Sequence, residues 1–320
     1  MALKNVLLLG GSGFVGGHIT RLLNEQGITV TIPSRRRERN KQSILLPLTE
    51  VVEADINDEA ALLTLVRGKD AVINLVGLLH TTDSTLTYGP TFARAHVELP
   101  KKIIHACQQA GVRRLVHMSA LKASPQGPSE YLRSKADGEA AVLAAQGALD
   151  VTVFRPSVIF GVGDSFLTTF ARIQAIAPVF PVGYPDARFQ PVHVEDVARA
   201  FVACLSDRDS FGQAYDLCGP KVYTLRELIA YAGEVSGHPR KIVALNDFFA
   251  YLQAGVLMLA PNPLLSPDNL RSMEVDSVSD EGCQVPPNWH PLPLEAVGPT
   301  YLSPKVPRIR YNTFRLTAGR

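Results

Sequence analysis

A glycine-rich turn close to the start of the chain constrains its fold more than any other feature. Residues 4–9 (KNVLLL) are an apolar run of the kind that forms a buried strand. That run leads directly into GGSGFVGG, and residues 18–27 (HITRLLNEQG) then carry apolar side chains at helical spacing and a closing glycine. A strand, a glycine turn and a helix in this order indicate a nucleotide-binding α/β fold.

The same alternation continues through the first half of the chain. Further strands are expected at residues 28–36, 49–55, 69–77, 112–120 and 149–157, and helices at residues 58–68, 92–111 and 130–147. Alternating strands and helices form right-handed βαβ units, which place the strands in a parallel sheet covered by helices on both faces. The sequence therefore predicts a Rossmann-type doubly wound parallel sheet with a small C-terminal α/β lobe.

The regular alternation of strands and helices ends after residue 156, where loops rich in proline, glycine and aromatic residues follow. We expect an NAD(P)-binding Rossmann domain at residues 1–156, a smaller substrate lobe interleaved with it at residues 157–290, and an extended basic tail at residues 291–320. Against a single acidic residue, Glu295, that tail carries five cations: Lys305, Arg308, Arg310, Arg315 and Arg320.

Composition narrows the range of functions. Of the 320 residues, 46% are hydrophobic and 19% are charged, as in ordinary globular proteins, and the net charge of +2 gives no reason to expect a nucleic-acid partner. The cysteines are scattered without a CxxC pair, and the histidines form no HxxH or HExxH pattern, so no metal site is expected. The N-terminus lacks the features of a signal peptide, and we expect a reducing, cytoplasmic location.

The glycine turn has the chemistry of a phosphate-binding loop. Gly10 would allow the tight turn, Gly13 would let the backbone approach a pyrophosphate, and Gly16 would let the helix pack close to the strand. The exposed N–H groups and the helix dipole would then bind the phosphates. We expect cofactor contacts along the whole loop, from Gly10, Gly11, Ser12, Gly13, Phe14, Val15 and Gly16.

The end of the second predicted strand selects the nucleotide. NAD-binding sites usually place an acidic residue there to accept from the ribose 2′-hydroxyl. This chain instead has Ser34, Arg35, Arg36 and Arg37, and its first acid is Glu38. Cations without an acid favour a 2′-phosphate, so we expect NADP(H) to be preferred, with NAD(H) as the alternative cofactor. The other interpretation of the arginines is a solvated basic loop.

Two further strand ends supply candidate cofactor contacts. Asp55 follows the third strand and could bind the adenine amino group, or equally cap the helix that follows. Gly77 closes the fourth strand in NLVG and would let the second half of the cofactor pass close by. The apolar neighbours Ile56 and Val76 are expected to contact the cofactor beside them.

The motifs together resemble the extended and atypical short-chain dehydrogenases/reductases. The matching pieces are GGSGFVG, the strand end at Asp55, NLVG, MSA, YLRSK, FRPSVIFG and QPVHVEDVA, and they span residues 5–205. YLRSK, RPSVIFGVGDSFL and the apolar segment at residues 248–260 are most similar to one atypical branch. That branch includes the nucleotide-binding accessory subunit of mitochondrial respiratory complex I, its bacterial relatives, and proteins tied to ubiquinone synthesis.

The resemblance implies roles for the YLRSK motif. Tyr131 would be the general acid/base for a substrate hydroxyl, and Lys135 would hold the nicotinamide ribose and lower the pKa of the tyrosine. Near the nicotinamide, the resemblance implies contacts from Met118, Pro156 and Ser157.

The chain also departs from the pattern of the family. The family's polarising serine falls at Ser119 or, if the strand ends are aligned differently, at Ala120, and only twelve residues separate Ser119 from Tyr131. The family's asparagine in the fourth helical region is replaced by His96. The tyrosine and lysine are therefore clearer candidates than the other members of the catalytic set.

Two classes of function remain open from the sequence. The chain could be an NAD(P)-dependent oxidoreductase that acts on a carbonyl or hydroxyl of an unknown small molecule through Tyr131, or a nucleotide-sugar epimerase. Alternatively, it could be a non-catalytic NADPH-binding accessory or assembly protein of respiratory complex I or ubiquinone synthesis. The apolar run at residues 248–260 is shorter than the roughly 20 residues of a membrane span. It would be a packed helix, or a surface that docks on the inner membrane or on a respiratory complex.

Overall fold

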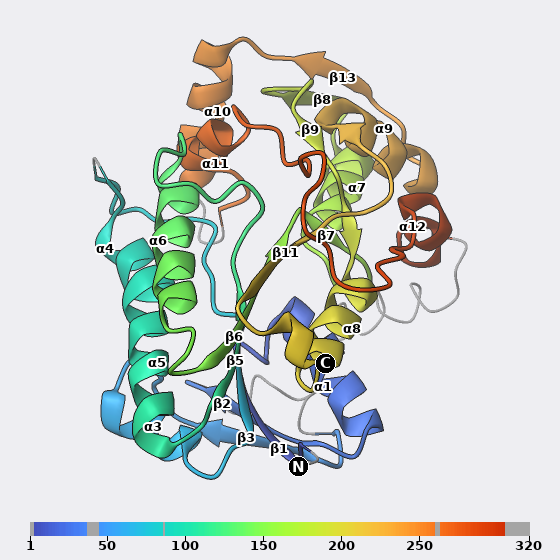
Figure 1. Ribbon diagram of the computed structural model, residues 1–320. Coiled ribbons are helices and arrows are strands. Elements are labelled where there is room, and N and C mark those ends of the chain that lie inside the picture. The colour runs from blue at the N-terminus through green and yellow to red at the C-terminus, as the bar shows by residue number, and fades with distance from the viewer. Residues whose placement is uncertain (1–2, 37–44, 86, 260–262, 305–320) are drawn as a thin grey trace. The chain divides into compact units, whose positions relative to one another are not determined.

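The computed structural model describes residues 3–36, 45–85, 87–259 and 263–304, which form two compact units. The first unit contains the chain up to Pro156 together with Glu195–Leu217 and Asp280–Trp289. The second contains Ser157–Val194, Cys218–Ser279 and the residues from His290 onward. The chain therefore leaves the first unit and returns to it twice (Figure 1).

A seven-stranded sheet, parallel throughout, is the centre of the first unit. Its strand order is β11-β6-β5-β4-β1-β2-β3, so the order reverses between β1 and β4. In open α/β sheets, ligands bind outside the carboxyl ends of the strands at such a switch point. The strands are β1 (Asn5–Leu9), β2 (Thr29–Ser34), β3 (Thr49–Glu53), β4 (Ala71–Asn74), β5 (Arg114–Met118), β6 (Asp150–Pro156) and β11 (Gln213–Leu217).

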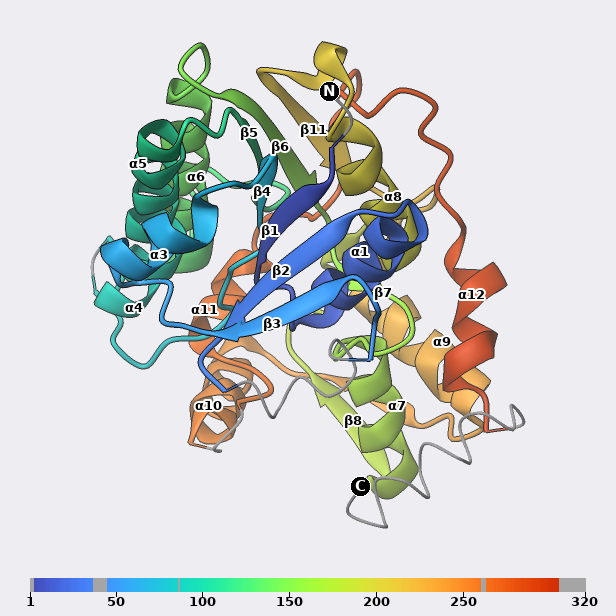
Figure 2. The same cartoon turned by 90° about the horizontal axis from the view of Figure 1, so that it is seen from below.

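Helices cover both faces of this sheet, which confirms the predicted doubly wound fold. Figure 2 shows α3, α5 and α6 on one side of the strands and α1 and α8 on the other. The helices of the unit are α1 (Phe14–Glu25), α3 (Glu59–Val66), α4 (Pro90–Phe92), the π-helix η2 (Ala93–Glu98), α5 (Leu99–Ala110), α6 (Glu130–Ala144), α8 (Val194–Cys204) and the 3₁₀ turn η3 (Arg208–Ser210).

The seventh strand, β11, comes from the part of the sequence that we assigned to the C-terminal lobe. It pairs with β6 from Gln213 opposite Thr152 to Leu217 opposite Pro156. Its outer side is covered by a returning segment, because Asp216 N–H donates to the carbonyl of Gln284 at 2.8 Å. An edge strand covered in this way is protected from pairing with another chain.

The second unit is built from short paired strands and helices. Three pairs form, and only β9–β12 is antiparallel: β7 (Ile159–Phe160) with β10 (Val192–His193), β9 (Arg188–Phe189) with β12 (Tyr223–Thr224), and β8 (Val179–Val182) with β13 (Lys241–Ala244). The helices are α7 (Leu167–Ile176), α9 (Leu225–Ser236), α10 (Asp247–Met258), α11 (Pro267–Ser272) and α12 (Leu294–Leu302). Phe166 packs against Phe170 and Phe189 within this unit.

Two expectations about the C-terminal part need correction. The segment from Pro291 was expected to be extended, but Leu294–Leu302 forms α12. The cations of the predicted tail, Lys305 to Arg320, lie outside the described residues. Helix α10 buries Ala250 and Ala254, yet four of its large apolar side chains are exposed, including Phe248 at 71% and Val256 at 60%. The packed-helix interpretation therefore holds for the face that contains Ala250 and Ala254, and not for the exposed apolar side chains. Among the described residues, no helix is long and apolar enough to cross a membrane.

Candidate functional site

The glycine turn between β1 and α1 has the geometry that the sequence predicted. Gly10 adopts a φ of +79°, in the left-handed region, and its carbonyl accepts from Gly13 N–H at 3.0 Å. Gly13 is the N-cap of α1 and provides no side-chain hydrogen bond, which leaves the helix N-terminus without a protein cap. A Cβ on Gly16 would lie 2.5 Å from Gly11 Cα, so helix and turn touch backbone to backbone. This cradle fits a bound pyrophosphate.

The other residues of the loop divide between solvent and core. Ser12 is exposed and Phe14 is half-buried, so both side chains are accessible. Val15 is buried in the core, at 7% exposure. Its side chain packs inside the protein, and only its backbone is available to a cofactor.

The residues that follow β2 and β3 bring opposite charges to the same edge of the sheet. Arg35 and Arg36 follow β2 and are exposed, and Ser34 Oγ accepts from Arg36 N–H at 3.3 Å. Asp55 lies two residues beyond the end of β3. The N–H of Asn57 lowers the pKa of Asp55, and the charge of Arg35 adds to that effect. Arg37 and Glu38, part of the same prediction, lie outside the described residues.

The helix-cap interpretation of Asp55 is wrong. The N-cap of α3 is Asp58, whose side chain accepts from Ala60 and Ala61 N–H. Asp55 Oδ1 instead accepts from the backbone and side-chain nitrogens of Asn57, at 3.0 and 2.8 Å. Ile56 is partly buried against the core of the unit.

Lys135 meets the loop after β4 at the centre of the first unit. It lies on α6 at 3% exposure, and its Nζ donates to the carbonyl of Met118 at the end of β5, at 3.2 Å. A Cβ on Gly77 would lie 2.9 Å from that Nζ, so the glycine leaves room for the lysine head group. Val76, just before it, donates its N–H to Asn74 Oδ1 at 3.1 Å. The predicted Gly77, Met118 and Lys135 are therefore brought together.

His96 connects this loop to α6. Its Nε2 accepts from Leu78 N–H at 2.9 Å, so the ring proton is on Nδ1, which donates to Ser134 Oγ at 2.8 Å. Ser134 Oγ in turn donates to the carbonyl of Tyr131 at 3.0 Å. Burial lowers the pKa of His96 to about 2, with a smaller effect from the charge of Lys135. The residue that replaces the family's asparagine is thus a neutral imidazole with both ring nitrogens hydrogen-bonded.

Tyr131 lies one helical turn before Lys135, packed between aromatic rings. Its ring meets those of His96 and Phe92 edge to face, at centroid distances of 5.7 and 6.4 Å. Burial raises the pKa of Tyr131 to about 12. We expected the lysine to lower this pKa, and that expectation is wrong because desolvation of the phenolate dominates. The phenol is therefore protonated at neutral pH.

Ser119 is the better candidate for the polarising hydroxyl. It is 3% exposed, and its Oγ is buried without a hydrogen-bond partner. An unsatisfied buried hydroxyl is uncommon in a native protein. It directly follows Met118, whose carbonyl binds Lys135. Ala120, the alternative, offers no donor.

The two residues predicted at the end of β6 fall in different units. Pro156 ends β6, and its carbonyl accepts from Leu121 N–H at 3.0 Å. Ser157 begins the second unit, where its Oγ donates to the carbonyl of Ser277 at 2.8 Å. The Ser157 hydroxyl is thus already engaged within its own unit.

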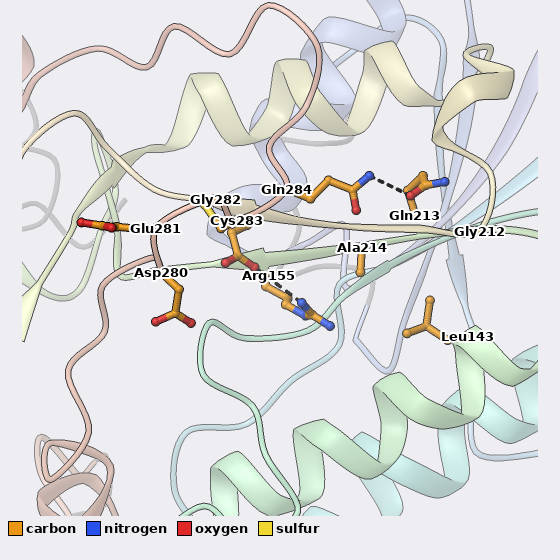
Figure 3. A pocket seen from close by; sticks show the side chains of 11 residues that line it. Leu143, Arg155, Gly212, Gln213, Ala214, Asp280, Glu281, Gly282, Cys283 and Gln284 are labelled. Carbon is orange, nitrogen blue, oxygen red and sulfur yellow. Dashed lines mark hydrogen bonds and ion pairs between the residues drawn. The ribbon is translucent and has the colours of Figure 1, made fainter.

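Sequence reasoning missed a charged network beside the site. Glu139 lies one turn after Lys135 on α6 and binds Arg155 of β6, whose Nη1 lies 3.7 Å from Asp216 Oδ1. The signal was present as the four-residue spacing of Lys135 and Glu139. Arg155 and Asp216 also line a groove of about 530 Å³ on this unit (Figure 3). Its other lining residues are Leu143, Gly212, Gln213, Ala214, Asp280, Glu281, Gly282, Cys283 and Gln284. Within the described ranges, no group of three or more metal-ligating side chains forms.

A second missed pairing lies on α1. The Nδ1 of His18 lies 2.5 Å from Glu195 Oε1 on α8, and Arg21 binds the other oxygen of that carboxylate. The two partners are 177 residues apart in the chain, so no local pattern could have shown the pair.

Known proteins resemble this chain in sequence and in fold. The mouse (Mus musculus) mitochondrial "NADH dehydrogenase [ubiquinone] 1 alpha subcomplex subunit 9" is 31% identical over 85% of this chain and 72% of its own length. The "Ceramide reductase" of Caulobacter vibrioides is 30% identical over 79% of this chain and 77% of its own length. The solved structure of the Streptomyces venezuelae dTDP-glucose 4,6-dehydratase DesIV, with NAD and TYD bound, has a TM-score of 0.66. It is 21% identical and covers 85% of this chain and 96% of that one, a likeness that shows the fold alone.

A family model matches the residues that carry the strands, the glycine turn and the YLRSK motif. The match runs from residue 6 to residue 218 and covers more than half of the chain. Together with the relatives, it confirms the relationship that the motifs suggested. The chain belongs to the NAD dependent epimerase/dehydratase family.

Proposed function

We propose that this chain is an NAD(P)H-dependent reductase that acts on a carbonyl substrate, with Tyr131 as the proton donor. The proposal rests on the position of Lys135. Its Nζ binds the Met118 carbonyl and lies beside Gly77, one helical turn from Tyr131. The glycine turn would hold the pyrophosphate, and Lys135 would donate to the hydroxyls of the nicotinamide ribose. When bound, the cofactor would supply a hydride from its nicotinamide C4.

The protonation state of Tyr131 suits the role of proton donor. Because burial raises its pKa to about 12, the phenol carries its proton at neutral pH and can give it to a carbonyl oxygen as the carbon accepts hydride. Ser119 Oγ, buried without a partner, would donate to the same oxygen and polarise the carbonyl. The Caulobacter relative is named as a reductase, which agrees with this proposal.

Arg35 and Arg36 support a preference for NADP(H) over NAD(H). Both guanidinium groups are exposed after β2, where a 2′-phosphate would lie, and no acidic side chain stands among the described residues of that strand end. Asp55, close enough for Arg35 to lower its pKa, would accept from the adenine amino group.

Hydride transfer from NADPH deuterated on its transferring face tests this function. The purified protein is incubated with that cofactor and a metabolite and lipid extract, and products are searched for deuterium by mass spectrometry. We expect deuterium in at least one small molecule, which identifies the substrate, and none with heat-denatured protein. Absence of transfer, with NADPH shown to be bound, would overturn the reductase proposal.

A nucleotide-sugar epimerase is less well supported. Such an enzyme needs cations for the substrate diphosphate, and Arg172 and Arg188 are the candidates in the second unit. Arg188 is already held by Asp276, to which its backbone N–H and its Nε donate at 2.9 and 2.8 Å. That leaves Arg172 as the remaining cation of the pair.

A non-catalytic accessory role is the second candidate, and the exposed face of α10 favours it. Phe248, Phe249, Leu252 and Val256 are between 53% and 71% exposed, and Leu259, the C-cap residue, is 86% exposed. An apolar stripe of this kind marks a docking surface for a protein or for a membrane. The mouse relative is named as a subunit of NADH dehydrogenase [ubiquinone], so a respiratory complex at the inner membrane is the partner that this candidate implies.

The accessory candidate predicts that docking depends on the stripe. Leu252→Ser with Val256→Ser should release the protein from purified respiratory complex I in native electrophoresis, while the wild-type protein migrates with it. Gln253→Ser, on the same helix, serves as the matched control. Migration of the wild-type protein apart from the complex would speak against this role.

A further inference from the structure

Lys135 carries its positive charge in a buried position, where the charged form is disfavoured. It is 3% exposed, and removal from water lowers its pKa to about 8, close to neutral pH. The titratable groups that face it from other elements are His96 of η2 and His117 of β5, whose pKa values burial lowers to about 2 and about 3. Tyr131 on its own helix is also uncharged at neutral pH. None of these three offsets the lysine charge.

Glu139 is the charged side chain that does offset it. Residues four apart on a helix lie on the same face, with Cβ atoms about 5–6 Å apart, so Glu139 lies beside Lys135 on α6. Glu139 is 6% exposed, and its field opposes the desolvation of the lysine. Its Oε1 accepts from Arg155 Nε at 2.8 Å, whereas its Oε2 is buried without a hydrogen-bond partner.

Arg155 fixes where this carboxylate points. It reaches Glu139 from β6, and its Nη1 lies 3.7 Å from Asp216 Oδ1 on the neighbouring β11. Glu139 is therefore held by the sheet as well as by its own helix. The guanidinium also offsets part of the negative charge that Lys135 experiences, so it sets the strength of the effect.

We propose that Glu139 is a positioning residue that keeps Lys135 protonated, and that Arg155 holds and moderates it. The electrostatic part of the proposal concerns the lysine alone, whereas its consequence for cofactor binding rests on the proposed function. A neutral Lys135 would donate more weakly to the ribose hydroxyls and would lose its attraction for a developing phenolate on Tyr131.

The protonation of Lys135 can be measured directly by NMR. The protein is labelled with carbon-13 at the lysine ε-carbons and titrated with base, and the Lys135 signal is assigned with Lys135→Arg. Glu139→Gln keeps an acceptor for Arg155 but removes the charge. We expect its Lys135 midpoint to fall by about one pH unit, because the negative charge that opposes the desolvation of the lysine is lost.

Two other variants separate the charge from the packing. Asp216→Asn also removes a partner of Arg155 but does not face Lys135, so its midpoint should equal that of the wild-type protein. Arg155→Gln removes the cation that offsets Glu139 and should raise the midpoint. This opposite shift tests the proposal even if Glu139→Gln does not fold.

NADPH titrations give the functional readout. Glu139→Gln should bind NADPH about threefold more weakly at pH 7.5 and regain close to wild-type affinity at pH 6, where Lys135 is protonated again. A structural defect would not be rescued by acid. An unchanged Lys135 midpoint in Glu139→Gln, or an equal shift in Asp216→Asn, would overturn the inference. A shifted midpoint in a protein that never binds NADPH would support the inference and overturn the proposed function.

Discussion

The imidazole of His96 accepts a hydrogen bond from the backbone N–H of Leu78 at 2.9 Å. This bond ties the loop after β4 to the π-helix η2, and the other ring nitrogen continues the connection to Ser134 on α6. A protonated imidazole has no acceptor nitrogen, so acid would break the link at Leu78. The arrangement that places Gly77 beside Lys135 therefore depends on a neutral His96.

This dependence predicts that the protein loses stability in acid. Burial lowers the pKa of His96 to about 2 and that of His117 to about 3, while both would titrate near 6.5 in the unfolded chain. Below pH 6.5 the unfolded state binds more protons, so stability falls as the pH falls. At pH 5 each histidine should cost about 2 kcal/mol of unfolding free energy relative to pH 7.

Urea unfolding at pH 7 and pH 5 checks this prediction. His96→Gln removes one of the two groups and should lose roughly half as much stability between these pH values as the wild-type protein. An equal loss in the two proteins would mean that other groups control the acid sensitivity.

The buried charge of Lys135 should lower the free energy of unfolding. Its folded pKa of about 8 lies below the value of about 10.4 expected in the unfolded chain, so its contribution to stability rises as the pH rises from 8 to 10. At pH 7 burial of the charge lowers the free energy of unfolding by about 3 kcal/mol. Replacing the lysine removes this cost, but it also removes the hydrogen bond to Met118, which contributes about 1 kcal/mol of stability. Lys135→Met should therefore be more stable by roughly 2 kcal/mol in denaturant unfolding, and less stability at pH 7 would contradict the account.

Two neighbouring glycines of α1 should respond in opposite ways to the same substitution. A Cβ on Gly16 would lie 2.5 Å from Gly11 Cα, a contact with rigid backbone, whereas a Cβ on Gly17 would meet nothing within 4 Å. Gly16→Ala should displace the turn and weaken NADPH binding at least tenfold. Gly17→Ala should leave the affinity within twofold and add up to about 1 kcal/mol of stability. Fluorescence titration and thermal unfolding measure the two effects, and similar affinities for both variants would show that the turn does not bind the pyrophosphate.

The arginines after β2 should distinguish the two cofactors. Arg35→Ala with Arg36→Ala removes the cations placed for a 2′-phosphate, so NADPH affinity should fall by about tenfold or more while NADH affinity changes less than threefold. Calorimetric titration with each cofactor measures both constants. An equal loss for NADPH and NADH would remove the reason for preferring NADP(H).

The fold could be predicted as far as local patterns carry information. Apolar runs, the glycine turn and helical spacing placed the first six strands and the helices between them, because each element has its own periodicity. Strand β11 was not recognised as part of this sheet, since it returns after a second unit, and its partner β6 lies about 60 residues earlier in the chain. Position in the sequence cannot show which sheet a short apolar run joins.

The candidate site could also be predicted only in part from the sequence. Residue types and motif spacing pointed to Gly77, Tyr131 and Lys135, and the structure places Gly77 and Lys135 in contact with each other. Protonation could not be predicted, because the pKa of Tyr131 is decided by burial, which a sequence does not show. The same is true of Glu139, whose spacing from Lys135 was visible but whose burial and anchoring by Arg155 were not.

The most direct test of the central claim compares hydride transfer by the wild-type protein and by Tyr131→Phe, using C4-deuterated NADPH and the substrate found in the extract. Removing the phenol proton should abolish deuterium transfer, while the NADPH dissociation constant stays within about twofold, since Lys135 and the glycine turn remain. Equal transfer by the two proteins would show that Tyr131 is not the proton donor. A loss of NADPH binding as large as the loss of transfer would show that the tyrosine's role is structural.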